Sequence, residues 1–547
     1  MKRLLTLVAL ALLACLAVSQ NAPQQPGRGT SGRGGGSPLN RALDTDRDGV
    51  ISRREIDNAA QSLLTLDADR NGRLSAAELG RDRPGGGDKG KRRPQTATSG
   101  GGNRAGYRMP TLAFQTDVPA RDYDIVLGRP TRNEITLSIL AHKTLELEIH
   151  CGQSPDDLAV VRPLAEFPAG RVRDVVIEGL QPDTRYHYRI DSRVGASGAP
   201  LSGSVKTFHT ARPPGSSFVF TVQADSHLDF GIVPELYANT LRNVVADRSD
   251  FHIALGDTFM VDKRTRFQDA APQYLAQRYY FGLLSDSTPL YFVLGNHDGE
   301  YGFRPDMAAW SGGMRKLHIP NPAPNRFYSG NTDRNPAIGA PEDYYAWQWG
   351  DALFVCLDPF RYTTNRKGSQ WSKTLGERQY RWLQHTLETS DTAFKFVFIH
   401  HLIGGLDNES RGAKNIARLY EWGGHNANGV NEWRRERPGW EMPIHDLCVK
   451  HGVNIVYHGH DHLYVKEELD GVIYQEVPQP GHRRFNNTRT AEEYGYDGVT
   501  FGSSGHIRVT VGPDGVKSEY VFSILPGMDA RGHRNGEIAH SYTIPRR

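Results

Sequence analysis

Five short apolar runs, each followed at once by side chains that bind metals, constrain the fold of this 547-residue chain most strongly. Continuous apolar runs of this length are typical of strands buried on both faces, in sheets that helices cover. Helical patterns at 233–247 and 376–389 lie between them. The runs are FVFTVQ at 218–223, FHIAL at 251–255, LYFVL at 290–294, FKFVFI at 394–399 and NIVY at 454–457.

The side chains after these runs predict a metal site. Ligands gather at the carboxyl ends of strands in open α/β sheets, so five strand ends can supply one site. Imidazole nitrogen and carboxylate oxygen without thiolate suit zinc, manganese or iron, and the set is too large for one tetrahedral ion. The residues are Asp225, Ser226 and His227; Gly256 and Asp257; Gly295, Asn296, His297 and Asp298; His400 and His401; and His458, Gly459, His460, Asp461 and His462.

The charge of a two-metal site indicates its substrate. Two divalent ions supply about +4; Asp225 and Asp257 remove two charges, and a bridging hydroxide removes one more. The remaining positive charge suits a phosphate anion. Two ions about 3.5 to 4 Å apart activate the attacking water and stabilise an in-line displacement. The pattern therefore predicts hydrolysis of a phosphate ester by hydroxide attack on phosphorus.

The order D-x-H, G-D, G-N-H-D, V-x-x-H and G-H-x-H, over residues 218 to about 525, resembles the calcineurin-like metallophosphoesterase superfamily. YYAWQWGDALFVCLD at 344–358 and WLQHTL at 382–387 look like its purple acid phosphatase branch. The resemblance implies a two-sheet αββα sandwich over 216–547, with an all-β domain before it. It also implies the metal ligands: Asp225, His227 and His462 for the first ion, Asn296, His400 and His460 for the second, and Asp257 as the bridge.

By the same resemblance, His297 contacts the phosphate and protonates the leaving oxygen, with Asp298 orienting it. Two other histidines are candidates for substrate binding. His401 adjoins a ligand motif, and His425 lies in the Gly-rich insertion YEWGGHNANGV. The role of His458 stays open.

Two departures from purple acid phosphatases concern the metals. Those enzymes have D-x-G at the first motif and a tyrosine ligand soon after the second. This chain has Asp225-Ser226-His227 at the first position and Phe259 after the second. A tyrosinate ligand is therefore not expected, and manganese, zinc and iron all remain candidates.

Residues 107–211 have an all-β pattern. EITLSILA and LELEIHCG are β-rich runs, and GLQPDTRYHYRI places a Pro-Asp turn before an alternating strand. The segment resembles a fibronectin type III-like sandwich, the kind of domain that precedes the catalytic domain in purple acid phosphatases. Such sandwiches serve many roles, so this domain does not indicate a function.

Two loops near the N-terminus, within residues 40–79, resemble an EF-hand pair. Each has oxygen side chains at positions 1, 3 and 5, Gly at 6, Ser at 9 and Glu at 12, as calcium coordination requires. Only 11 residues separate the loops, a spacing partly like a dockerin adhesion module. The predicted calcium ligands are Asp44, Asp46, Asp48 and Glu55, and Asp67, Asp69, Asn71 and Glu78.

Residues 1–19 have the layout of a secretory signal peptide, with two positive charges before an apolar run. A lipoprotein signal at Cys15 is the alternative; Leu13 and the apolar residues after Cys15 favour the first interpretation. The chain is thus expected to be secreted or periplasmic, without a membrane span. Residues 80–106 predict a flexible linker with seven basic and two acidic side chains, which, with the EF-hand pair, could contact a cell surface.

The charge balance argues against nucleic acid as a partner. The net charge is +3, and loss of Lys2 and Arg3 with the signal leaves it near +1. The inserts 299–343 and 404–442 carry equal numbers of acidic and basic residues, so neither forms a basic track. Cys151, Cys356 and Cys448 give no disulfide framework, although one bridge stays open.

The sequence therefore predicts a secreted two-metal phosphoesterase that hydrolyses small phosphate monoesters. Two alternatives stay open. One is a phosphodiesterase. The other is a calcium-dependent adhesion protein with a decayed catalytic domain.

Overall fold

The computed structural model describes residues 114–195, 197–404 and 411–546. The signal peptide, EF-hand pair and linker predicted for residues 1–106 lie outside the described residues. Within those described, no helix combines the length and the apolar character that a membrane crossing needs. Cys151, Cys356 and Cys448 are buried free thiols.

Residues 123–209 form two antiparallel sheets that share one apolar core. The first has the strand order β1-β2-β5; the second has the order β4-β3-β6-β7, and β8 also pairs with β6. The predicted all-β architecture is confirmed, and the fibronectin type III assignment stays a prediction. The strands are β1 (Tyr123–Gly128), β2 (Glu134–Ala141), β3 (Leu145–Ser154), β4 (Asp157–Phe167), β5 (Val172–Glu178), β6 (Arg185–Arg193), β7 (Leu201–Ser202) and β8 (Lys206–His209).

A six-stranded sheet follows, with the order β11-β10-β9-β20-β21-β22. β9, β10 and β11 are parallel, and β20 joins β9 in the antiparallel sense. β20 and β21 form an antiparallel hairpin, and β22 pairs with β21 at the edge of the sheet. The strands are β9 (Phe218–Gln223), β10 (Phe251–Ala254), β11 (Leu290–Phe292), β20 (Gly505–Gly512), β21 (Gly515–Phe522) and β22 (Ile538–Pro545).

An eight-stranded sheet has the order β12-β13-β14-β15-β16-β18-β17-β19. Its central strands β14, β15, β16 and β18 are parallel. The strands are β12 (Ser329–Gly330), β13 (Tyr345–Trp349), β14 (Ala352–Cys356), β15 (Phe394–Phe398), β16 (Ile455–His458), β17 (Leu463–Leu469), β18 (Val472–Glu476) and β19 (Val499–Gly502).

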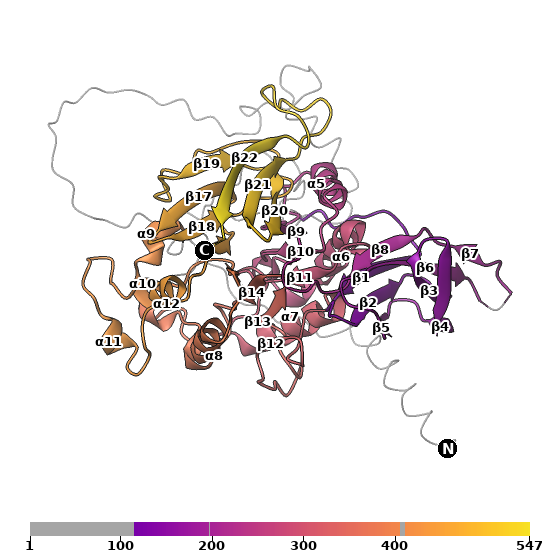
Figure 1. Ribbon diagram of the computed structural model, residues 1–547, viewed down its shortest axis with the longest axis horizontal. Coiled ribbons are helices and arrows are strands. Elements are labelled where there is room, and N and C mark those ends of the chain that lie inside the picture. The colour runs from indigo at the N-terminus through magenta and orange to yellow at the C-terminus, as the bar shows by residue number, and fades with distance from the viewer. Residues whose placement is uncertain (1–113, 196, 405–410, 547) are drawn as a thin grey trace, which may run out of the picture. The chain divides into compact units, whose positions relative to one another are not determined.

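The two larger sheets pack face to face through aromatic side chains. Phe220 of β9 and Phe251 of β10 each lie 5.1 Å, between ring centroids, from Phe354 of β14. Helices cover the outer faces, as Figure 1 shows for α6 and α8. This arrangement confirms the predicted αββα fold. The longer helices are α5 (Pro234–Ala246), α6 (Ala271–Ser285), α7 (Pro305–His318), α8 (Gly376–Glu388) and α12 (Ile444–Lys450).

Short helices occupy the loops of this domain. They are α9 (Lys414–Ala417), α10 (Tyr420–Gly423), α11 (Trp433–Glu436) and the 3-10 helices η1 (Val261–Lys263), η2 (Phe267–Ala270) and η3 (Gln370–Ser372). The five apolar runs divide between the two sheets: three become β9, β10 and β11, and two become β15 and β16.

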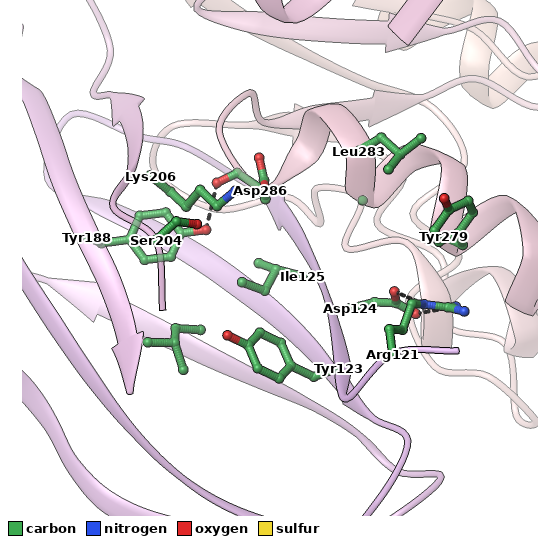
Figure 2. A pocket seen from close by; sticks show the side chains of 12 residues that line it. Arg121, Tyr123, Asp124, Ile125, Tyr188, Ser204, Lys206, Tyr279, Leu283 and Asp286 are labelled. Carbon is green, nitrogen blue, oxygen red and sulfur yellow. Dashed lines mark hydrogen bonds and ion pairs between the residues drawn. The ribbon is translucent and has the colours of Figure 1, made fainter. Parts of the chain in front are cut away.

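Polar contacts attach the β domain to α6 around a cavity of about 280 Å³ (Figure 2). At one end, the Tyr188 hydroxyl donates to the Asp286 carbonyl at 2.7 Å, and Lys206 forms an ion pair with the Asp286 carboxylate. Near the cavity, Arg278 of α6 is fully buried and donates to the Ser138 carbonyl at 2.6 Å. These contacts make the β domain part of the support of the catalytic domain.

Asp358, two residues after the end of β14, is a buried carboxyl group in an acidic environment. Its Oδ1 accepts the Phe360 N–H at 2.7 Å, whereas its Oδ2 has no hydrogen-bond partner among the described residues. Burial, and then the nearby charge of Asp343, raise the pKa of Asp358 to about 8. The folded state therefore binds a proton that the unfolded state has released above about pH 4.

Asp358→Asn should remove a pH dependence of stability. Because the folded pKa is raised, the wild-type carboxyl costs stability as the pH rises from about 4 to about 8, by up to about 1.4 kcal/mol per pH unit. The amide does not ionise, so the variant should be more stable than wild type at pH 8 and lose that advantage toward pH 4. Chemical denaturation at several pH values measures this. A constant difference between the two proteins would contradict it.

Candidate metal centre

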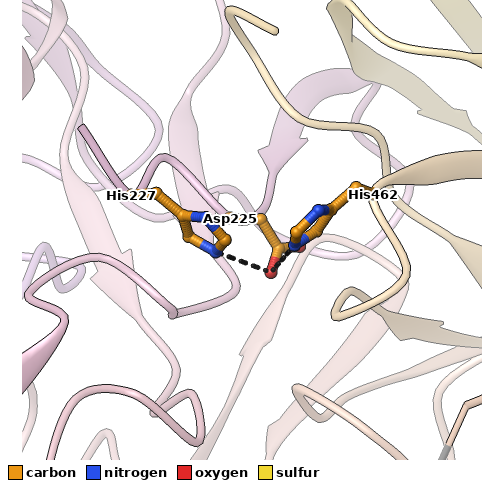
Figure 3. A group of neighbouring side chains, drawn as sticks. All are labelled: Asp225, His227 and His462. Atoms are coloured by element: carbon orange, nitrogen blue, oxygen red, sulfur yellow. Dashed lines mark ion pairs between the residues drawn. The ribbon is translucent and has the colours of Figure 1, made fainter. Parts of the chain in front are cut away.

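Two groups of metal-binding side chains lie where the strands of both sheets end. Asp225 and His227 follow β9, and His462 precedes β17; these three form the first group (Figure 3). Asp257 after β10, His400 after β15 and His460 after β16 form the second. Within each group the donor atoms all lie within 4.8 Å of one another.

The backbone at these residues has an unusual conformation. Five of the seven predicted ligands have a positive φ, which non-glycine residues adopt rarely and at a cost of roughly 1–3 kcal/mol each. Such strain persists only where the surrounding structure enforces it, and it is common at functional sites. These residues are Asp225 (φ 58°), His227 (38°), Asp257 (52°), His460 (81°) and His462 (63°).

Glycines of the motifs allow the loops to approach each other closely. A Cβ on Gly256 would lie 2.2 Å from the Gly295 nitrogen, and a Cβ on Gly295 would lie 2.1 Å from the Asp257 nitrogen. A Cβ on Gly459 would lie 2.8 Å from Asp225 Oδ2. A side chain at any of these three positions would clash with a neighbouring loop, so the G-D, G-N-H-D and G-H-x-H motifs need glycine there.

Asp257 lies between the two groups. Its Oδ2 is 3.8 Å from His227 Nε2 of the first group and 3.2 Å from His400 Nε2 of the second. Its Oδ1 accepts the His297 backbone N–H at 2.7 Å, which fixes the carboxylate plane. One oxygen of Asp257 thus faces both groups, the placement that a bridging ligand needs.

Two histidine rings are oriented by their second nitrogen. His400 Nδ1 lies 2.6 Å from the Leu255 carbonyl, so Nδ1 carries the proton and the Nε2 lone pair faces Asp257. His227 Nδ1 lies 3.6 Å from Asp229 Oδ2, and its Nε2 faces Asp225 and Asp257. In both rings Nε2 is therefore the nitrogen directed into the site.

The donor atoms fit metal ions. Asp225 Oδ1 and the Nε2 atoms of His227 and His400 are buried and lack hydrogen-bond partners among the described residues, a costly state without a ligand. Burial alone would raise the pKa of Asp225, but His462, His227 and His400 hold it well below its usual range. Asp225 is therefore an anionic ligand. Two carboxylates with imidazoles suit divalent ions such as zinc or manganese.

Asn296 is also buried at this centre, beside His297: its Nδ2 lies 3.2 Å from His297 Nε2. Burial alone lowers the pKa of His297, but the carboxylates of Asp257 and Asp262 raise it above its usual value. His297 Nε2 lies 3.8 Å from Asp257 Oδ2, next to the two groups. These carboxylates therefore favour a protonated imidazole beside the two donor groups.

Asp298 does not take the position predicted for it. Its two oxygens accept backbone N–H groups of Asp257, Thr258, Phe259 and Gly295 at 2.8 to 3.0 Å, so it holds the loops after β10 and β11 together. The contact with His297 comes from Asp262 instead, whose Oδ1 lies 2.9 Å from His297 Nδ1. The prediction that Asp298 orients His297 is corrected on this point.

The centre opens toward solvent on one side. The side chain of His462 is 36% exposed, whereas that of His400 is fully buried.

His401 is buried, with its ring 5.0 Å from that of His460, and burial together with the charge of His400 lowers the pKa of His401 to about 3. His425 lines a separate cavity of about 640 Å³ and has its Nδ1 2.8 Å from the Gly423 carbonyl.

The loop that carries His460 and His462 is held by buried acids. His458 Nδ1 lies 2.6 Å from Glu476 Oε2, and His458 belongs to neither donor group. Glu476 Oε1 accepts the Asp461 N–H, and Asp461 accepts from Arg411 at 2.8 Å and from the Tyr496 hydroxyl at 2.6 Å.

Four acids were thus missed as positioning residues: Asp229, Asp262, Asp461 and Glu476. Asp461 lies between the ligands His460 and His462, and Asp229 lies two residues after His227. This closeness in the sequence could have identified both acids as supports of the ligands. Asp262 and Glu476 carry no local pattern that would have marked them.

Asp257→Asn should release both metal ions, because the amide removes the negative charge shared by the two groups. Asp262→Asn is the matched control: it makes the same chemical change in the same loop, but its side chain bonds His297 and belongs to neither donor group. Metal analysis after desalting should find about two transition-metal ions per chain fewer than wild type in the first variant and the wild-type content in the second. Equal metal content in the two variants would refute the central placement of Asp257.

Comparisons with known proteins agree with this geometry. Residues 218–464 match the family model of the calcineurin-like phosphoesterases, and residues 41–58, the first predicted calcium loop, match an EF-hand model. No curated protein matches the chain.

Two solved structures share the fold. PhoD has a TM-score of 0.54 at 14% identity, over 77% of this chain and 90% of that one. The purple acid phosphatase PPD1 from yellow lupin (Lupinus luteus) seeds has a TM-score of 0.51 at 16% identity, over 77% of this chain and 74% of that one. With its family match and its two donor groups, the chain contains a calcineurin-like phosphoesterase domain and is a metal-dependent phosphoesterase.

Proposed function

We propose that the chain is a secreted phosphomonoesterase that uses two metal ions. One observation carries the proposal: Asp257 Oδ2 faces His227 of one donor group and His400 of the other, at 3.8 and 3.2 Å. A single site of three or four ligands would not need a second complete group beside it. When bound, two such ions supply the Lewis acidity and the activated water that phosphate-ester hydrolysis requires.

His297 supplies the proton of the reaction. Its Nδ1 is held by Asp262, and its Nε2 points toward the donor groups. The carboxylates of Asp257 and Asp262 favour the protonated ring, whose Nε2 would donate a hydrogen bond to a phosphate oxygen and then a proton to the leaving oxygen. The structure supports Asp262 as the residue that orients this ring.

The charge around the opening supports a monoester, which carries more negative charge than a diester. Arg411, beside the ligand loop, donates to the His460 carbonyl at 2.9 Å. Arg483 and Arg484 are exposed in the segment that runs beside the loop after His227, where the Arg483 N–H donates to the Gly231 carbonyl. Both segments thus place basic residues next to the loops that carry His227 and His460.

The metals proposed are manganese, zinc or iron at the catalytic centre and calcium at the EF-hand loops. Phe259 stacks on Tyr274 with the ring centroids 3.9 Å apart, which supports a centre without a tyrosinate ligand after the G-D motif. Secretion rests on the leader-like residues 1–19. Contact with a cell surface through the basic linker stays a prediction from the sequence.

A panel of phosphate esters tests the proposal. After reconstitution with manganese, zinc or iron, the protein should hydrolyse p-nitrophenyl phosphate faster than bis(p-nitrophenyl) phosphate. Dominant turnover of the bis-ester would assign a phosphodiesterase instead. A protein with under one transition-metal ion per chain and no activity after reconstitution would favour the adhesion protein with a decayed domain.

His297→Ala should lower kcat about 10²- to 10⁴-fold, the usual contribution of a general acid, while the metal content stays at the wild-type value. In this variant, the rate of hydrolysis should fall less for an ester whose leaving group needs no proton, such as p-nitrophenolate, than for an ester of an alkyl alcohol. His385→Ala, an exposed histidine on α8, is the control and should behave as wild type. An equal loss of rate on both leaving groups would show that His297 is not the proton donor.

A further inference from the structure

A third group of metal-binding side chains lies in the β domain, apart from the catalytic centre. Glu148 and His150 are on β3, and Asp191 is on the adjacent strand β6. The β3–β6 register pairs Glu148 with Asp191, and His150 follows Glu148 by two residues on the same face. Their donor atoms all lie within 4.8 Å of one another, as in the two catalytic groups.

The distances fit a bound ion. His150 Nε2 lies 3.0 Å from Glu148 Oε2 and 3.1 Å from Asp191 Oδ2. Ligands about 2.1 Å from one metal ion are separated by about 3.0 Å in octahedral and about 3.4 Å in tetrahedral geometry. The corresponding distances at the catalytic centre, from Asp225 Oδ1 to the Nε2 atoms of His227 and His462, are 3.6 and 3.5 Å.

His150 Nε2 is a buried atom without a hydrogen-bond partner among the described residues, although both carboxylate oxygens are near. The oxygens therefore lie close to this nitrogen but off the direction in which it would donate or accept. The side chain itself is only 12% exposed. An ion within the group would satisfy the nitrogen and both oxygens together.

The charges across the two strands also favour a cation. Glu148 stands directly opposite Asp191, and like charges in this position destabilise a sheet. The next pair along the same strands, Glu146 opposite Arg193, has opposite charges and forms an ion pair of 2.7 Å. Arg189 binds Asp191 with its Nε on Oδ1 at 2.8 Å and its Nη2 on Oδ2 at 2.9 Å, so these hydrogen bonds go to Asp191 and not to Glu148.

We propose that Glu148, His150 and Asp191 bind one divalent transition-metal ion on the outer face of the β domain. The imidazole nitrogen selects zinc, cobalt or manganese over calcium, which prefers oxygen ligands throughout. Water completes the coordination because the group is partly exposed. Arg189 stays hydrogen-bonded to Oδ1 of Asp191 and competes with the ion for Oδ2. We therefore expect a dissociation constant for the metal in the micromolar range and not below it.

Zinc binding to the full-length protein tests the site. The catalytic centre is loaded first, and saturating calcium fills the EF-hand loops. Isothermal titration calorimetry with Zn²⁺ should then show one further site in wild type. The affinity of this site for Zn²⁺ should be at least tenfold weaker in His150→Ala and in Glu148→Gln. Glu146→Gln, which breaks the neighbouring ion pair on the same face, is the matched control and should keep the site.

Each outcome decides the proposal. A titration that is the same in wild type and in both site variants overturns it, as does the loss of the zinc site when calcium is raised. Cobalt absorption gives a second measurement, with a visible band that disappears in Glu148→Gln. Circular dichroism and p-nitrophenyl phosphate turnover should be unchanged in all variants, so unfolding or damage to the catalytic centre is recognised separately.

Discussion

The carboxylate of Asp298 accepts four backbone N–H groups, and the geometry of the catalytic centre depends on it. Three come from the loop after β10 and one from the loop after β11, all at 2.8 to 3.0 Å. Burial and the charge of Asp257 raise the pKa of Asp298 to about 6, and the N–H groups oppose this shift. By joining the two loops, Asp298 places Asp257 between the donor groups and His297 beside them. Its role is structural support of the site.

Much of this architecture could be predicted, because short apolar runs bounded by ligand residues have few other interpretations. All five runs became strands, and the seven ligand candidates come together at the strand ends or are buried beside them. The runs did not indicate which sheet each strand joins. β9 and β15, for example, are both short apolar runs but belong to different sheets. Strand pairing depends on contacts between residues far apart in the chain, which a local pattern does not contain.

The supporting acids show a second limit of sequence patterns. Asp262 lies five residues after Asp257 and Glu476 lies fourteen residues after His462, and neither is part of a recurring spacing. Their roles come from the fold: η1 turns Asp262 toward His297, and β18 runs beside β16 so that Glu476 reaches the ligand loop. The left-handed backbone of five ligands has the same origin. Tertiary contacts impose it, and they offset its local cost.

The most direct test of a two-ion centre is an anomalous-diffraction map of crystals grown with manganese or zinc. At the catalytic centre, two peaks about 3.5 to 4 Å apart should lie on either side of the Asp257 carboxylate. One peak should adjoin Asp225, His227 and His462, and the other His400 and His460. A single peak coordinated by one donor group, with the other group empty at saturating metal, would contradict it.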